Sequence, residues 1–320
     1  MRRSTRRSCQ VAALSAIALL AAGCASVPTS PDAGSSPTSK LVTSGPATAP
    51  SSPSDTSPGT SPSDGPKPGK GKHAKGKNPF ASLPSYPSSV TAAVYDAATG
   101  KTYVLHPGVS EDTASIVKVQ IMGTLLKQAQ TAGSPLPGTE LSLMTSMIEA
   151  SDNSSATQLL ADAGGPSSVK TFDESVGMTS TEPHDTTPYI NGDPNLPAWG
   201  LTTTTAADEV KLVRAFAYTN SVLNSTNRNY GIGLMTHIEA DQDWGVSGGV
   251  GTGTTVALKN GWLPLDVANN SNWQVDSIGW IKGNGRDYVL AVLTNGNASE
   301  QAGIDTISHI SAVVYSQLRH

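Results

Sequence analysis

Hydrophobic and polar residues alternate at both ends of the region from residue 89 to residue 320, whereas helical spacing dominates its middle. The first two β-rich runs flank a glycine-containing turn and predict a β-hairpin. Three further runs near the carboxyl end predict strands, and an amphipathic helix follows them. The expected strands are 89–95, 101–105, 254–262, 273–282 and 287–294, and the closing helix is 299–318.

Apolar positions recur every three or four residues between these strands, which predicts a series of helices. The stretch 113–122 reads as the first turns of one helix, with acidic and hydroxyl residues at 111–113 as its N-cap and first turn. The other expected helices are 141–149, 154–163, 167–176, 205–218 and one that ends near His237. Residues 179–200 lack a period and predict a long loop, a kind of segment that is often functional.

This order of elements predicts an α+β fold. Strands from both chain ends would form an antiparallel sheet of about five strands, flanked by terminal helices, with an all-helical lobe inserted between them. A cleft between the sheet and the lobe is the expected place for a site.

The first 23 residues have the layout of a secretory signal peptide, with four arginines before an apolar run that ends at Ala22. Cys24 follows a small-residue cleavage site and resembles the lipidated cysteine of bacterial lipoproteins. We therefore expect a protein that is anchored to the cell membrane by lipid on its outer side, with the choice between Sec and twin-arginine export left open. Its only other cysteine, Cys9, lies in the signal peptide, so the mature chain has no disulfide.

Residues 24–80 are rich in Ser, Pro, Thr and Gly and predict a disordered tether, which leaves 81–320 as the folded domain. The tether ends in a basic run from Lys67 to Lys77. This run is either a solubilising spacer or a contact for anionic lipid head groups or wall polymers.

Charge is divided unevenly along the chain. The first 80 residues hold 10 of the 21 Lys and Arg but 3 of the 25 Asp and Glu, so residues 81–320 carry a net charge of about −11. An acidic domain argues against nucleic acid as a partner, because phosphate binding requires the opposite sign.

Ser115 and Lys118 stand three positions apart, so they would be neighbours on one helix face. A lysine that is desolvated in a cleft can accept the proton of a serine and make it a nucleophile. The same spacing recurs at Ser167 and Lys170, where a solvated helix face is the simpler interpretation. The spacing alone therefore does not show which serine, if either, is a nucleophile.

Two motifs follow the first pair in order. Ser151-Asp-Asn153 lies between two predicted helices, 36 residues after Ser115, and Lys259-Asn-Gly261 lies in a predicted strand, 108 residues after Ser151. This ordered set resembles the penicillin-recognising serine hydrolases, and the layout is most similar to the class A β-lactamases. The resemblance extends from about residue 89 to the carboxyl end.

The resemblance implies a role for each matching residue. Ser115 would be the nucleophile and Lys118 its base, while Ser151 would relay the proton to the leaving nitrogen. Asn153 would bind a substrate amide, and Lys259 would attract a substrate carboxylate.

The strand after Lys259 would complete the site. Gly261 would let the substrate approach closely, and the backbone N–H groups of Ser115 and Trp262 would form an oxyanion hole. Asn260 stands where this family has a Thr or Ser that contacts the substrate, and the bulky Trp262 would narrow the cleft.

Release of the acyl group requires a further residue. Glu182 in the long loop is the candidate that would activate water, although Thr186 replaces the asparagine that the family has four residues later. A solvated loop acid is the equally weighted alternative for Glu182.

The resulting hypothesis is a serine hydrolase that is acylated at Ser115 by a β-lactam or by a related amide or ester. The alternatives are a D,D-peptidase acting on peptidoglycan-like peptides, and a non-catalytic envelope lipoprotein that serves as a binding module. We expect a monomer without cofactor or metal, since the histidines lack ligand spacing.

Overall fold

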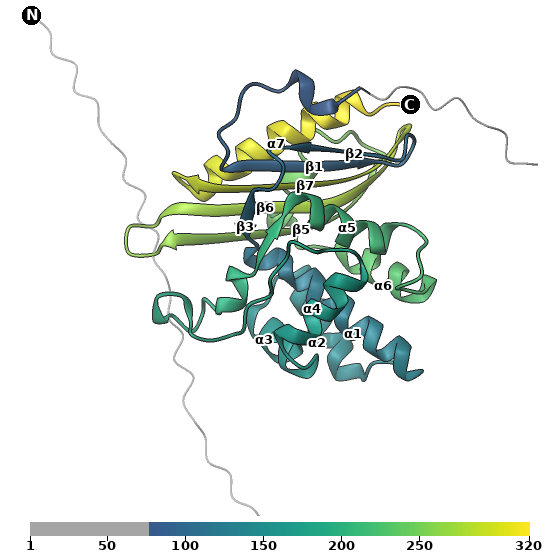
Figure 1. Ribbon diagram of the computed structural model, residues 1–320, viewed down its shortest axis with the longest axis vertical. Helices are drawn as coiled ribbons and strands as arrows, with labels where there is room; N and C mark the ends of the chain where they lie inside the picture. The colour runs from purple at the N-terminus through teal and green to yellow at the C-terminus, as the bar shows by residue number, and fades with distance from the viewer. Residues whose placement is uncertain (1–76) are drawn as a thin grey trace, which may run out of the picture. The chain divides into compact units, whose positions relative to one another are not determined.

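The computed structural model describes residues 77–320, and the predictions for the signal peptide, for Cys24 and for nearly all of the tether lie outside these residues. Five antiparallel strands from both ends of the described region form the main sheet, as predicted, and their order is β2-β1-β7-β6-β5 (Figure 1). Strand β1 therefore pairs with β7 from the other end of the chain. The strands are β1 Val90–Asp96, β2 Lys101–Leu105, β5 Thr255–Asp266, β6 Ser271–Gly283 and β7 Arg286–Asn297.

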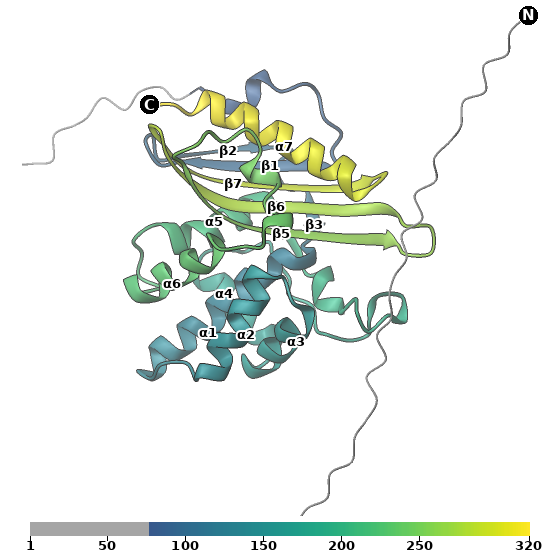
Figure 2. The same ribbon diagram turned by 180° about the vertical axis from the view of Figure 1, so that it is seen from behind.

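Within residues 77–320, seven α-helices pack on the two faces of this sheet. Helix α7 covers one face and the other six helices lie on the opposite side (Figures 1 and 2). The helices are α1 Lys118–Ala132, α2 Gly138–Glu149, α3 Asn153–Asp162, α4 Pro166–Ser175, α5 Ala206–Ala217, α6 Ser225–Met235 and α7 Glu300–Gln317. Within residues 77–320 none of them combines the length and the apolar character that crossing a bilayer requires.

The two-residue period of the strands explains why the sheet has a core on each face. In β7, Val289, Ala291 and Leu293 belong to the core shared with the helical lobe. The alternate residues Leu290 and Val292 belong to the second core, beneath α7. All five are fully buried, so this central strand separates two apolar layers.

A second, two-stranded sheet lies at the edge of the helical lobe. Strand β3, Ser110–Asp112, pairs antiparallel with β4, Thr203–Thr205. The prediction of an N-cap and first helical turn at 111–113 was wrong, since Glu111 and Asp112 are extended and the side chain of Thr113 caps nothing. This pairing ties the segment before Ser115 to the end of the long loop.

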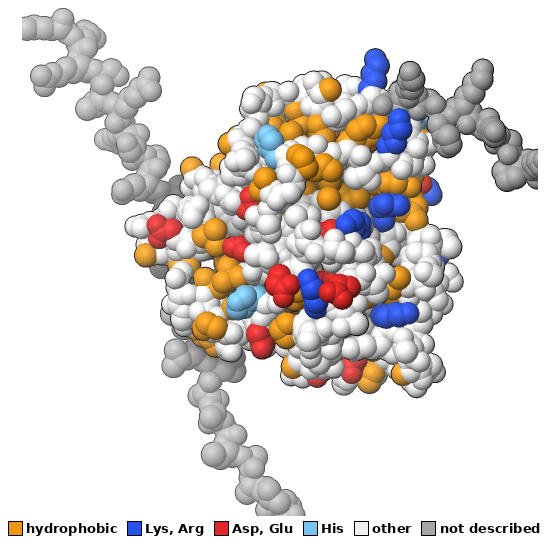
Figure 3. Space-filling view, in the orientation of Figure 1, with side chains coloured by type: hydrophobic (Ala, Val, Ile, Leu, Met, Phe, Trp, Pro, Cys, Tyr) orange, Lys and Arg blue, Asp and Glu red, His pale blue; other side chains and the backbone are white. Residues whose placement is uncertain are grey.

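The packed part of the chain begins slightly before residue 81. Residues Pro79–Ser82 form a short 3-10 turn, in which Pro79 and Phe80 are buried. Phe80 joins the apolar cluster beneath α7. On the surface, acidic and basic side chains are interspersed on the face shown in Figure 3.

Candidate active site

Ser115 lies in a tight turn that leads into the long helix α1. The turn is a 3-10 helix, Ala114–Val117, and α1 continues from Lys118. Ala114 adopts a left-handed conformation, with φ of 43°. Such backbone strain in a residue with a side chain is found mainly where surrounding structure enforces it, often at functional sites. Here the turn is fixed on one side by a hydrogen bond from the Thr113 N–H to the Thr202 carbonyl, 2.8 Å long.

The ammonium nitrogen of Lys118 is the centre of the polar contacts around Ser115. Its Nζ lies 3.0 Å from Ser115 Oγ and 3.1 Å from Ser151 Oγ. The same atom lies 2.6 Å from the Ser151 carbonyl oxygen and 2.7 Å from Asn153 Oδ1. The structure thus brings together Ser115, Lys118, Ser151 and Asn153, which the motifs placed in one site.

These four contacts fit a neutral amine. The Ser151 carbonyl and Asn153 Oδ1 can only accept hydrogen bonds, so they take two N–H groups of Lys118. The two hydroxyls can also donate, and one of them can direct its proton to the lone pair of a neutral Nζ. Burial, together with the positive charge of Lys259, holds the pKa of Lys118 well below its usual range, while Asp152 opposes the shift.

Ser151 owes its position to a break between two helices. Helix α2 ends before it, and Asp152 caps α3 by accepting a 2.6 Å hydrogen bond from the Ser155 N–H. Ser151 itself has a φ of 57°, a conformation that few side-chain-bearing residues adopt. Asn153 is held from the other side, because its Nδ2 donates to the Asn195 carbonyl at 3.0 Å.

Strand β5 supplies the opposite wall and is the edge strand of the main sheet. Gly261 packs so closely against the nucleophile turn that a Cβ atom there would lie 2.7 Å from the Thr113 oxygen and 2.8 Å from the Ser115 nitrogen. Any side chain would therefore push the strand away from Ser115. Because an edge strand leaves backbone N–H groups unpaired, β5 can offer donors beside the nucleophile.

Lys259 is completely buried in the same strand, and its Nζ donates to the Asn260 carbonyl at 3.1 Å. Burial lowers the pKa of Lys259 to about 7. Two lysines with lowered pKa values in one interior region are typical of a functional site.

Asn260 and Trp262 occupy different environments. Asn260 is buried, and its Nδ2 donates to the carbonyls of Gln242 and Trp244 at 2.7 and 3.2 Å. Its amide thus binds the segment beneath the strand, and Asn260 is not among the residues that line the cleft at Ser115. Trp262 does line that cleft and packs edge-on against Trp244, with ring centroids 5.8 Å apart.

The cleft beside Ser115 is narrow, with a volume of about 30 Å³. That space accommodates roughly one water molecule. Apart from Ser115 and Asn153, its lining is apolar or glycine. The remaining lining residues are Ala114, Ile190, Leu196, Pro197, Trp199, Gly200, Trp262 and Leu263.

The loop residues in this wall were not predicted individually from the sequence. Trp199 is the clearest example: its ring centroid lies 5.0 Å from Lys118 Nζ, and its Nε1 donates to Thr157 Oγ1 at 3.1 Å. The absence of a period marked the whole segment as a loop that could carry function. A tryptophan in a loop that is otherwise rich in Pro, Asp, Thr and Asn is the sequence signal that could have indicated this residue.

Glu182 does not line the cleft at Ser115. Its side chain is 75% exposed and forms an ion pair with Lys170 Nζ at 3.0 Å. The backbone of Glu182 pairs with Thr203 in an isolated β-bridge, which fixes the direction of the loop. Lys170, the lysine of the second Ser-x-x-Lys sequence, thus forms an ion pair with Glu182, the residue predicted to activate water.

Among residues 77–320 no group of three or more His, Cys, Asp or Glu side chains is arranged to hold a metal ion. His184 and His237 lie on exposed loops at the surface.

Comparison with known proteins agrees with this geometry. A model of the β-lactamase enzyme family matches residues 134–318. Comparison with curated protein sequences gives no match.

Solved structures of class A β-lactamases have a similar fold. TLA-1, an extended-spectrum β-lactamase, is 18% identical with a TM-score of 0.64, and the alignment covers 72% of this chain and 93% of that one. The putative class A β-lactamase PenP from Rhodopseudomonas palustris is 21% identical with a TM-score of 0.59, over 71% and 93% of the two chains. A mutant of PBP-A, solved as an acyl-enzyme complex with penicillin G, is 19% identical with a TM-score of 0.58, over 71% and 89%.

Proposed function

Because the chain belongs to the β-lactamase enzyme family, we propose that it is a membrane-anchored extracytoplasmic serine hydrolase whose Ser115 is acylated by a β-lactam or by a related amide or ester. We further propose that the acyl group is released slowly. The observation that carries the first part is the position of Lys118 Nζ between the hydroxyls of Ser115 and Ser151, at 3.0 and 3.1 Å.

This position supports a proton relay. Neutral Lys118 takes the Ser115 proton as Oγ attacks the carbonyl carbon, and the tetrahedral oxyanion then expels the amide nitrogen. Ser151 gives its proton to that nitrogen and regains one from Lys118. The acyl–oxygen bond and one N–H bond form, the C–N bond breaks, and Lys118 ends neutral again.

The nucleophile turn and strand β5 would stabilise the oxyanion. Gly261 allows β5 to approach the Ser115 nitrogen closely, which favours an oxyanion hole formed by the N–H groups of Ser115 and Trp262. Donors that are fixed in place before reaction are usually the largest source of rate enhancement in acyl transfer.

Slow release follows from the composition of the cleft wall. Hydrolysis of the acyl-enzyme needs a base that activates water, and the residues that line the cleft include no carboxylate. Glu182 is bound to Lys170 instead. The penicillin G acyl-enzyme of PBP-A, a protein with the same fold, is consistent with an intermediate of this kind.

The place of action is part of the proposal. The signal layout and Cys24 favour a lipid anchor, and the basic run from Lys67 to Lys77 favours contact with anionic lipids or wall polymers. Globomycin-sensitive processing and radiolabelled palmitate incorporation, both lost in Cys24→Ala, would test the anchor. Incorporation that persists in this variant would contradict it.

Intact-mass spectrometry after incubation with several β-lactams tests the chemistry. We expect an increase by the full mass of the drug in the wild type and none in Ser115→Ala. A persistent adduct supports acylation with slow release, whereas hydrolysed drug with unmodified protein would contradict slow release. Neither adduct nor hydrolysis would contradict acylation by this class of ligand.

One observation favours a binding module as the second candidate. The cleft directly beside Ser115 holds only about 30 Å³, and Trp262 lines it, which favours binding without reaction at Ser115. A D-Ala-D-Ala peptide separates the possibilities: turnover indicates a D,D-peptidase, and binding without an adduct in the folded protein indicates the module.

A further inference from the structure

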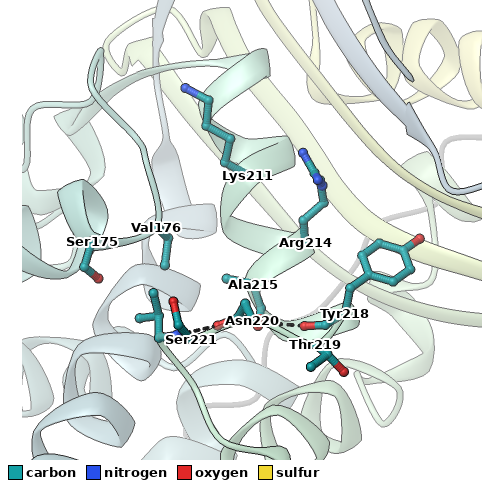
Figure 4. Close-up of a pocket in the computed structure, with 10 residues that line it drawn as sticks. Ser175, Val176, Lys211, Arg214, Ala215, Tyr218, Thr219, Asn220 and Ser221 are labelled. Atoms are coloured by element: carbon teal, nitrogen blue, oxygen red, sulfur yellow. Dashed lines mark hydrogen bonds between the residues drawn. The ribbon is translucent and has the colours of Figure 1, made fainter. Parts of the chain in front are cut away.

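A second cavity lies at the carboxyl ends of α4 and α5, separate from the cleft at Ser115. It has a volume of about 300 Å³ and shares no lining residue with that cleft. Two cationic side chains, Lys211 and Arg214, project from the same side of α5 into this region (Figure 4). The other lining residues are Ser175, Val176, Ala215, Tyr218, Thr219, Asn220, Ser221 and Val222.

The guanidinium of Arg214 makes no hydrogen bond and no ion pair within residues 77–320. Its Nε is buried without a hydrogen bond, and none of the four ion pairs of this region includes Arg214. The group stacks on the ring of Tyr95, with Cζ 3.7 Å from the ring centroid. The two Nη groups are not among the buried unsatisfied atoms and make no hydrogen bond within residues 77–320, so their N–H donors are free for an acceptor in the adjoining cavity.

Arg286 provides an internal control for this interpretation. It also stacks on a tyrosine, Tyr315, at 3.7 Å. Unlike Arg214, it donates from Nε to the Tyr315 carbonyl and from Nη1 to the Asn284 carbonyl. Both arginines thus stack on a tyrosine in the same way, but Arg286 uses its N–H donors in hydrogen bonds and Arg214 does not.

The charges around the cavity leave Arg214 available for an anion. Asp208 is already paired with Lys211 at 2.8 Å, and Lys211 also donates to the Gly177 carbonyl. Asp287 accepts from Tyr218 and Trp280 and pairs with Lys282. Glu174, exposed beside Ser175, is the remaining acid near the rim.

We propose that this cavity binds a phosphate group, held by the Arg214 guanidinium and by the remaining N–H of Lys211. The planar fork of arginine matches two oxygens of a phosphate. Thr219 and Ser221 lie on the lining, and their hydroxyls can donate to the other oxygens. A volume of about 300 Å³ exceeds the needs of inorganic phosphate and suits a phosphate ester.

Side-chain NMR of the ¹⁵N-labelled protein tests the proposal. Potassium phosphate is titrated against potassium chloride at equal ionic strength, and the Arg214 Nε–H signal is identified by its absence from the spectrum of Arg214→Lys. We expect this signal to shift and saturate at millimolar phosphate while the Arg286 signal stays in place. Equal responses of the two arginines, or equal effects of phosphate and chloride, would overturn the proposal.

Variants provide an independent measurement. Arg214→Gln is expected to weaken phosphate binding about tenfold or more, since it removes a bidentate charged contact. Lys211→Gln, which keeps Arg214 in place, should weaken it less, and Arg286→Gln should leave it unchanged. If Arg214→Gln fails to fold, titration of phosphate into the wild type and into Lys211→Gln still tests the proposal. Equal phosphate affinity of these two proteins would contradict the proposed contact with Lys211.

Two further ligands distinguish the sources of the phosphate. Binding of sn-glycerol 3-phosphate that depends on Arg214 indicates a soluble ester, and Arg214-dependent binding only to phosphatidylglycerol vesicles indicates a lipid head group. Both results support a phosphate site. Binding of acetate as tight as that of phosphate would overturn the preference for phosphate.

Discussion

Ser115 with Lys118 and Ser167 with Lys170 share one spacing, but their lysines lie in opposite surroundings. Lys118 is fully buried and contacts two serine hydroxyls, and the charge of Lys259 lowers its pKa more than the charge of Asp152 raises it. Lys170 is half-buried and pairs with the exposed Glu182. Burial and like charge favour a neutral amine at the first site, whereas the lysine of the second site is bound in an ion pair with an acid.

The same contrast extends to acids near the second pair. Burial raises the pKa of Asp173 to about 9, and nearby Glu209 adds to this shift while Lys170 opposes it. Lys170 thus lies among acidic neighbours. The comparison shows that the spacing permits a nucleophile–base pair, and that burial together with a third contact decides whether one forms.

Replacing each serine by alanine should give the largest difference in covalent labelling between the two pairs. Ser115→Ala is expected to abolish covalent labelling by a fluorescent penicillin, because no oxygen remains to be acylated. Ser167→Ala, on an exposed helix start, is the matched control and should label like the wild type. Labelling that survives in Ser115→Ala would move the nucleophile elsewhere.

Replacing each lysine by methionine should give the next largest difference, which is in the acylation rate. Lys118→Met keeps most of the buried volume but removes the base, so the acylation rate should fall about 10²- to 10⁴-fold. Stopped-flow measurement with nitrocefin gives this rate, and circular dichroism confirms folding. Lys170→Met should change the rate less than about twofold, and a larger loss there would break the comparison.

The pH dependence of the acylation rate should sharpen the comparison between the two lysines. The base must be unprotonated, so the rate should rise with pH, about tenfold per unit at most, and level off above the lowered pKa of Lys118. Lys259, with a pKa of about 7, gains charge below that pH and further disfavours a charged Lys118. Lys170→Met should leave the profile unchanged. A profile still rising at pH 10 would contradict a neutral Lys118.

The smallest effect is expected at the ion pair of the second site. Glu182→Gln removes a largely exposed charge, so the free energy of unfolding should change by less than about 1 kcal/mol. The rate at which the acyl group is released, followed by mass spectrometry, should stay within about twofold. A release rate that falls much further would restore Glu182 as the water-activating base.

Much of the fold could be predicted because its signals are local. Alternation and helical spacing located the five main strands and the helices within a few residues, and the fold class was confirmed. The short pair β3 and β4 was missed, since three-residue strands have no detectable period. Its formation depends on a partner more than 90 residues away.

The site was predictable where motifs fix the chemistry. Ser115, Lys118, Ser151 and Asn153 meet as their order suggested. The direction of the Asn260 amide could not be read from the sequence, because a strand's register decides which face a side chain occupies. The cleft wall from the long loop was equally hidden, since a loop's path depends on tertiary contacts.

Strand β1 completes the sheet only by pairing with β7, in a register that places Ala93 beside Ala291. A ribosome must therefore finish almost the whole chain before the hairpin of β1 and β2 can join the rest of the sheet, and pairing over such a distance in sequence is slow. Until then the edge of β1 that pairs with β7 stays unpaired, which favours misassembly. Truncation before Arg286 should therefore remove the strand with which β1 pairs, although β1 lies at the other end of the domain. We expect the main sheet to form only after β7 has been synthesised.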